Sequence, residues 1–158
     1  MQYRIGNGID IHQLEKGIPL IIGGVPIPFQ KGSKGHSDGD VLFHVIVDAI
    51  LGSLSLGDIG KYFPSDNSKW KNADSRFFLE HVFKLINEKG YSVENIDATI
   101  ILQEPIISHH ILQMREKLVS ILLVDLDQIS VKATTTDKLG FIGKGEGIAA
   151  TASVLIKK

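Results

Sequence analysis

Hydrophobic and polar residues follow regular periods along most of the chain. Alternation with a period of two, interrupted by glycine and proline, predicts five strands. Apolar residues three or four positions apart predict three helices. The predicted strands cover residues 3–12, 20–29, 96–103, 129–136 and 147–156. The predicted helices cover residues 41–50, 75–89 and 109–123.

The second predicted strand contains residues that are uncommon in strands, namely Gly23, Gly24, Pro26 and Pro28. Proline lacks the amide hydrogen that a strand ladder needs, so this strand is predicted to be irregular or to lie at a sheet edge. A turn at residues 15–17 makes it the expected hairpin partner of the first strand. Three further segments have no sustained period and are predicted to be loops: residues 30–39, 57–72 and 137–146.

Capping residues mark the ends of two helices. Asp38 or Asp40 is predicted to cap the first helix, because a short polar side chain can accept hydrogen bonds from the free amides of the first turn. Asp74 or Ser75 is predicted to start the second helix, and Gly90 to end it. The resulting order of elements, without internal repeats, predicts an α+β fold. We expect a two-layer αβ sandwich, with helices on one face of a mixed sheet.

Length and composition narrow the possible functions. The chain has 158 residues, of which 43% are hydrophobic, and we predict a single domain over residues 1–158. A formal net charge of -1 argues against nucleic acid or an anionic membrane as a partner. His44 and Asp48 interrupt the most apolar stretch, so no membrane span is predicted. The first ten residues do not resemble a secretory signal, and we expect a cytoplasmic protein.

The chain has no cysteine, so a transition-metal site here requires imidazole and carboxylate ligands. Asp10 and His12 are two positions apart on a predicted strand, so their side chains share one face. His44 lies in an otherwise apolar helix, where an unpartnered imidazole is costly. Two histidines and one carboxylate form a catalytic zinc set. The alternative is that each histidine makes only an ordinary hydrogen bond.

Three more motifs suggest phosphate or sugar binding, and each has a purely structural alternative. His36-Ser37-Asp38-Gly39-Asp40 precedes a helix N-terminus, which favours anions but equally needs a cap. Gly57-Asp58-Ile59-Gly60 offers a carboxylate to sugar hydroxyls, or is a helix-exit turn. The segment 132–141, KATTTDKLGF, offers hydroxyls for phosphate and an oxygen ligand for magnesium, or is a strand end and a solvated turn. His81, His109 and His110 show no partner spacing.

Together the four motifs, with G-x-G-x-D-x-H at residues 6–12 as the first, resemble one family. It is the 2-C-methyl-D-erythritol 2,4-cyclodiphosphate synthases of non-mevalonate isoprenoid synthesis, and the resemblance covers residues 3–156. It implies a homotrimer with active sites between subunits. The implied reaction is attack of a 2-phosphate on the β-phosphate of a cytidine diphosphate substrate, with release of CMP. The implied location is the bacterial cytoplasm, or the plastid stroma after removal of a transit peptide.

The resemblance also implies roles for individual residues. Asp10, His12 and His44 would bind zinc, and Asp137 a second cation, magnesium or manganese. His36 and Thr135 would stabilise the transition state. The substrate-binding residues that it implies are Asp10, His12, His36, Ser37, Asp58, Ile59, Gly60, Phe63, Pro64, Ser65, Asp66, Asn67, Leu102, Pro105, Ile106, Ile107, Ser108, Ala133, Thr134, Thr135, Thr136, Asp137, Phe141 and Lys144. Lys144 and Glu146 would face a central channel that can hold an isoprenoid diphosphate.

The chain departs from the family pattern at four positions. Asp137 stands where glutamate is usual, which predicts an altered preference for the second metal. Ile106 replaces a common lysine, Ser65 a frequent acid, and Lys144 a frequent arginine, which removes the planar guanidinium fork. Two other functions fit the same residues. One is a zinc-dependent phosphoesterase, and the other is a non-catalytic trimeric binding protein with a structural zinc.

Overall fold

A computed structural model describes all residues from Met1 to Lys158 and has a mixed α+β architecture. Its main sheet has five strands in the order β4-β1-β7-β5-β6, and β2 and β3 form a separate pair. The pairs β4-β1, β1-β7 and β7-β5 are antiparallel, whereas β5-β6 is parallel. The strands are β1 (Tyr3–Lys16), β2 (Leu20–Ile22), β3 (Val25–Ile27), β4 (Lys31–Ser33), β5 (Ser92–Ile101), β6 (Ile129–Thr134) and β7 (Gly147–Lys157).

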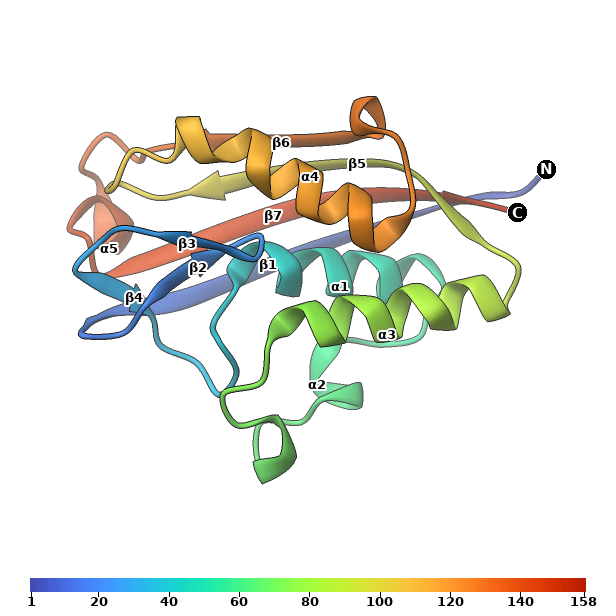
Figure 1. The fold of residues 1–158 in the computed structure, drawn as a ribbon, viewed down its shortest axis with the longest axis horizontal. Helices are drawn as coiled ribbons and strands as arrows, with labels where there is room; N and C mark the ends of the chain where they lie inside the picture. Colours follow the sequence, from blue (N-terminus) through green and yellow to red (C-terminus); the bar gives the residue numbers. More distant parts are fainter.

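Three long helices lie on one side of this sheet (Figure 1). Helix α1 packs against β1 and β7, α4 packs against β6, and α3 packs against α1 and α4. The helices are α1 (Val41–Ser53), α2 (Ile59–Tyr62), α3 (Ser75–Glu88), α4 (Ile111–Leu122) and α5 (Gly140–Gly143). Single 3-10 turns cover Ser68–Trp70, Ser108–His110 and Leu126–Gln128. None of these helices has the length and apolar character that crossing a lipid bilayer requires.

The main sequence-predicted elements are confirmed, and capping explains where two helices start. Asp40 caps α1 by accepting a hydrogen bond from the Phe43 amide at 3.0 Å. Asp74 caps α3 by accepting one from the Arg76 amide at 2.8 Å. Gly90 follows α3 with a φ of 81°, which favours glycine. Helix α1 is buried on nearly all sides, which explains why apolar residues surround it and it has no polar face.

The prediction of one strand over residues 20–29 was wrong. Gly23 and Gly24 have φ values of 59° and 70°, and they turn the chain so that β2 pairs with β3. Two residues with positive φ form the tight turn of a hairpin, which glycine accepts without steric cost. Strand β1 pairs instead with the short β4, on its side away from β7. The three predicted loops were also only partly correct, since residues 30–39 contain β4, residues 57–72 contain α2 and residues 137–146 contain α5.

The exposed face of β1 is unusually apolar. Ile5, Ile9 and Ile11 are 72%, 62% and 54% exposed, and they lie on the face away from α1. The opposite face of the sheet is buried, and Ile148, Ala150, Ala152, Val154 and Ile156 of β7 contribute to its core. A row of exposed isoleucines on one strand leaves apolar area in water, which is typical of an interaction surface.

Candidate metal centre and active site

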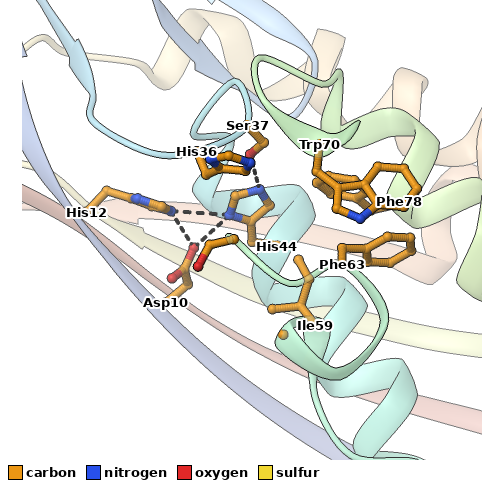
Figure 2. A pocket seen from close by; sticks show the side chains of 11 residues that line it. Asp10, His12, His36, Ser37, His44, Ile59, Phe63, Trp70 and Phe78 are labelled. Atoms are coloured by element: carbon orange, nitrogen blue, oxygen red, sulfur yellow. Dashed lines mark hydrogen bonds and ion pairs between the residues drawn. The ribbon is translucent and has the colours of Figure 1, made fainter. Parts of the chain in front are cut away.

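Three side chains from two elements converge at one end of the sheet (Figure 2). The Asp10 carboxylate lies 2.8 Å from Nε2 of His12 and 3.1 Å from Nδ1 of His44. The two ring nitrogens are 3.2 Å apart. Because each residue offers one ligand atom, the three form a group able to hold a metal ion.

The glycines of β1 explain how His44 reaches this position. Gly6 and Gly8 lie on the same strand face as Asp10 and His12, and this face packs against α1. A Cβ atom at Gly6 would lie 1.8 Å from the Ala49 carbonyl oxygen. Helix α1 therefore packs against strand backbone, without a side chain between them, and this close approach carries His44 over the strand to Asp10.

The outer nitrogen of each imidazole is already engaged. Nδ1 of His12 lies 3.0 Å from the Lys34 carbonyl oxygen, to which it can only donate. Nε2 of His44 lies 2.8 Å from the Ser75 hydroxyl and 3.0 Å from the Ser37 hydroxyl. The remaining nitrogen lone pairs face each other and the carboxylate. Ligands of a tetrahedral zinc lie about 3.3 Å apart, so this donor set fits zinc after a small outward adjustment.

The pKa values of two of these groups, Asp10 and His12, are shifted by their surroundings. Burial raises the pKa of Asp10, but hydrogen bonds and charge interactions with His12 and His44 outweigh it and leave this pKa well below its usual range. Burial lowers the pKa of His12, but the hydrogen bond and charge interaction with Asp10, together with the hydrogen bond to Lys34, outweigh it, and the net pKa is raised. The centre is therefore an anionic carboxylate held between two imidazoles, which suits a cation.

A cavity of about 270 Å³ opens beside the metal group. Polar residues form one side and an aromatic and aliphatic wall forms the other, as in Figure 2. The lining residues are Asp10, His12, His36, Ser37, His44, Ile59, Gly60, Phe63, Ser65, Trp70 and Phe78. His36 is held by a 2.9 Å hydrogen bond to the Asn67 carbonyl oxygen. Small-molecule sites combine such an apolar wall with a few placed polar groups.

The His36–Asp40 motif caps α1 and also contributes two residues to the cavity lining. His36 and Ser37 line the cavity, whereas both aspartates bind backbone. Besides capping α1, Asp40 accepts bonds from the amides of Gly23 and Gly24 at 2.9 and 2.7 Å. Burial raises the pKa of Asp40 to about 6, although these bonds oppose the shift. Asp40 therefore joins the β2-β3 turn to the helix that carries His44.

Hydrogen bonds fix two residues of the Gly57–Gly60 motif, Asp58 and Ile59. Asp58 caps α2 by accepting a 3.0 Å bond from the Lys61 amide. The Ile59 amide donates to the Asp48 carboxylate of α1 at 2.7 Å. Ile59 and Gly60 line the cavity, but Asp58 does not. Among the other residues predicted here, Phe63 and Ser65 line it as well, whereas Pro64, Asp66 and Asn67 lie outside the lining.

Eight of the predicted substrate-binding residues line a second cavity of about 350 Å³. Within this chain it is a separate cavity from the one beside the metal group. It is bounded by Leu102, Gln103, Pro105, Ile106, Ile107, Ser108, Ala133, Thr134 and Thr135. The chain therefore places His36 and Thr135, the two residues with an expected role in the transition state, in different cavities.

The last predicted site residues lie after β6. Asp137 is exposed with a φ of 51°, and its amide bonds to the Thr135 hydroxyl at 3.2 Å. The Thr136 hydroxyl donates to the Leu139 carbonyl at 2.8 Å. Phe141 lines a hollow with His12 and Glu146, and Lys144 lines another with Lys31 and Lys138. None of them lies in the cavity beside the metal group.

Three residues of the site were not predicted. Trp70 and Phe78 line the first cavity, although the helical spacing of Phe78 predicts only a core residue. Ser75 is fully buried against His44, and its sequence position indicates only a helix start. His81 and His109 are exposed, as their lack of partner spacing suggested.

The fold and the site define a class of protein: a mixed α+β chain with two histidines and one carboxylate beside a ligand-sized cavity. A family model, the YgbB family, matches residues 3–157, and the chain belongs to this family. This confirms the resemblance found in the motifs. The 2-C-methyl-D-erythritol 2,4-cyclodiphosphate synthase of Bacillus velezensis is 54% identical over 156 residues, 99% of both chains. The enzyme of that name from Bacillus subtilis is 53% identical, again over 99% of both.

Solved structures agree with these relatives. The IspF CDP complex of Plasmodium falciparum matches with a TM-score of 0.86 and 38% identity, over 98% of this chain and 95% of that one. The bifunctional IspDF of Campylobacter jejuni matches with a TM-score of 0.95 and 42% identity. That match covers 99% of this chain and 42% of the bifunctional one.

Proposed function

We propose that this chain is a single-domain enzyme that forms 2-C-methyl-D-erythritol 2,4-cyclodiphosphate. Its substrate would be 4-diphosphocytidyl-2-C-methyl-D-erythritol 2-phosphate, and its second product CMP. The observation that carries the proposal is the group of Asp10, His12 and His44 at the mouth of a cavity, in a chain of this family. The names of the relatives and the CDP complex of one of them support the same reaction.

The proposed step balances without water. A non-bridging oxygen of the 2-phosphate forms a bond to the β-phosphorus, and the bond from that phosphorus to the oxygen bridging to the α-phosphate breaks. CMP leaves with the electron pair of this bond. A phosphate oxygen is already anionic, so no protein base is required, and catalysis consists of alignment and offset of charge.

The proposed cations are zinc at Asp10, His12 and His44 and magnesium or manganese at Asp137, and when bound they offset the negative charge of the phosphates. Asp137 has one methylene less than the usual glutamate. We therefore expect the activity to persist with a changed preference for the second cation. A titration showing no divalent requirement beyond zinc would remove Asp137 from the site.

The chain's own residues would bind and orient the substrate. His36 and Ser37 line the first cavity beside the metal group and can donate hydrogen bonds to phosphate oxygens. Ile59, whose amide is held by Asp48, and Gly60 would hold the methylerythritol portion. The second cavity would hold cytidine, with Thr135 at the phosphates. Its apolar residues fit a base, and its position where β5 and β6 end leaves backbone groups available.

We further propose a homotrimer in which each active site combines the first cavity of one subunit with the second cavity of its neighbour. Two observations support this arrangement. The two cavities are separate within one chain, although the reaction needs His36 and Thr135 at the same phosphates. The exposed isoleucines of β1 also provide an apolar surface for a partner. Lys144 and Glu146 would then face a central channel that could accept an isoprenoid diphosphate.

Product analysis tests the reaction. Purified protein is supplied with the proposed substrate, zinc and magnesium in heavy-oxygen water, and the phosphorus products are identified by phosphorus NMR and mass spectrometry. A cyclic diphosphate without solvent oxygen, together with CMP, is the expected result. Solvent oxygen in an open product would instead support the phosphoesterase.

A pair of variants separates catalytic zinc from structural zinc. His44→Ala should abolish the cyclisation while retaining a folded circular dichroism spectrum. His81→Ala is the control, because His81 is exposed and outside the cavity. If His44→Ala lowered the melting temperature but still released CMP, the zinc would be structural and the proposed mechanism wrong.

Subunit mixing tests the shared site. His44→Ala damages the first cavity and Thr135→Ala the second, so each homotrimer should be inactive. Co-refolding them in equal amounts restores intact pairs of cavities at about one quarter of the sites, because both halves must come from the right subunits. About a quarter of the wild-type activity is expected. An inactive mixture of folded trimers would show that each site lies within one chain.

A further inference from the structure

His44 makes different contacts with its two ring nitrogens. Nδ1 faces Asp10 and His12, at 3.1 and 3.2 Å. Nε2 points the other way, into hydroxyl groups, and lies 2.8 Å from Oγ of Ser75. Figure 2 shows His44 between the Asp10-His12 pair on one side and Ser37 on the other. A neutral imidazole carries one proton, so which nitrogen holds it decides whether Nδ1 can bind a metal.

Ser75 is well placed to decide this. It is the first residue of α3, and none of its surface is exposed. Its hydroxyl forms a short contact with Oδ1 of Asp38, and its amide donates to Oδ2 of Asp38 at 3.0 Å. A carboxylate only accepts hydrogen bonds, so the serine hydrogen points to Asp38. The lone pairs of the hydroxyl oxygen are then left for the N–H of His44.

The second hydroxyl near His44 lacks such a fixed direction. Ser37 lies 3.0 Å from Nε2, but its other neighbours are the Gly39 amide at 3.4 Å and the Ser75 hydroxyl at 3.5 Å. No carboxylate directs its hydrogen. Ser37 also lines the cavity, where a ligand can compete for its hydrogen bonds. Ser75 is therefore the hydroxyl that favours one tautomer.

We propose that Asp38 and Ser75 are positioning residues that hold His44 with its proton on Nε2 and its Nδ1 lone pair directed at the metal. The inference rests on the proposed function, because it assigns these residues to the zinc of that site. We call this series of contacts, which runs from Asp38 through Ser75 and His44 to the ion, the relay. With the opposite tautomer, the Nε2 lone pair would face the oxygen lone pairs of Ser75, which is unfavourable at 2.8 Å.

The relay also joins two adjacent segments, the loop before α1 and α1 itself, to the start of α3, which is distant in the sequence. Asp38 belongs to the loop before α1, His44 to α1 and Ser75 to α3. The same loop and the start of α3 are paired by backbone, since the Asp38 amide donates to the Ala73 carbonyl at 3.0 Å. His12 needs no such relay, because its outer nitrogen donates to the backbone carbonyl of Lys34. Only one of the two imidazole ligands therefore depends on side chains for its tautomer.

Metal affinity tests the proposal directly. Apo protein is titrated with cobalt and with zinc against a competing chelator, and the cobalt absorption spectrum is recorded at saturation. Loss of a residue that orients a metal ligand typically weakens binding 10- to 100-fold. We expect Ser75→Ala to weaken both metals about tenfold, the lower end of that range, because Ser37 still accepts from His44. The cobalt spectrum should shift with it.

Ser53→Ala is the matched control. Ser53 is also a buried helix serine, and its hydroxyl donates to the Ile50 carbonyl at 2.6 Å without touching the metal group. The affinity of the Ser53→Ala variant for both metals should stay within about threefold of the wild type, and its cobalt spectrum should be unchanged. If Ser75→Ala did not fold, Asp38→Asn would carry the same test, because the amide no longer supplies an acceptor-only group to Ser75. Equal weakening in the Ser53 control would show a general structural effect and overturn the proposal.

The outcomes separate this inference from the proposed function. If His44→Ala bound metal as tightly as the wild type, the metal centre itself would be wrong. If the wild type bound metal through His44 but Ser75→Ala and Asp38→Asn bound within threefold of it, only the relay would be overturned. If the relay variants behaved as expected but the wild type formed no cyclic product, the relay would stand and the proposed reaction would fail.

Discussion

Replacing Gly8 by alanine tests whether close packing of α1 on β1 builds the metal centre. A Cβ atom at Gly8 would lie 2.4 Å from the Val45 carbonyl oxygen, whereas Cβ contacts under 3.0 Å essentially never occur. The helix must therefore move away by about 0.6 Å or more, because neither partner is a flexible side chain. Overpacking of this kind costs about 1–3 kcal/mol of stability.

The same displacement should reach the metal group. His44 lies one residue before Val45, and metal–ligand distances tolerate only about 0.2 Å of error. Gly8→Ala should therefore lower both the free energy of unfolding and the zinc affinity. Urea unfolding at a fixed protein concentration and chelator competition measure the two effects.

Gly52→Ala is the control for this prediction. A Cβ atom there meets nothing nearer than the Asn7 carbonyl oxygen at 3.9 Å. Alanine is also a better helix former than glycine by up to about 1 kcal/mol, so this variant should be as stable as the wild type or more stable. The packing argument is refuted if Gly8→Ala unfolds at the wild-type urea concentration. Destabilisation with wild-type zinc affinity would refute its link to the metal centre.

Three further predictions concern neighbouring parts of the site. Burial raises the pKa of Asp40 from 3.8 to about 6, so ionisation of this carboxyl favours the unfolded chain. The contribution of Asp40 to the free energy of unfolding should therefore fall by about 2 kcal/mol from pH 4.5 to pH 7. Asp40→Asn should lack this decline in urea unfolding, and parallel curves for the two proteins would contradict it. Asp48→Ala removes the acceptor of the Ile59 amide, so KM for the substrate should rise about two- to tenfold, with a smaller change in kcat. An unchanged KM would show that Asp48 does not hold this turn. Zinc at 100 times its Kd should stabilise the wild type by about 2.7 kcal/mol in the same assay and His44→Ala by far less, and equal stabilisation would place the ion elsewhere.

Local patterns in the sequence predicted much of this protein. Helix α1 was predictable because its apolar residues repeat at helical spacing after a capping aspartate, and both signals act within a few residues. The pairing of Asp10 with His12 followed from the two-residue period of a strand. The motifs then identified the family, because four of them occur in the right order. His44 was a candidate ligand because it is a polar residue in an apolar helix.

The rest depended on contacts between distant segments. The hairpin in residues 20–29 is an exception, because the Gly23-Gly24 turn that divides it is a local feature of the sequence. Ser75 reads as an ordinary helix start, but packing of α3 against α1 buries it beside His44. The division of the predicted site between two cavities also has no signal in sequence spacing. Periodicity and capping report on neighbours along the chain, whereas burial and convergence arise only when separate elements pack together.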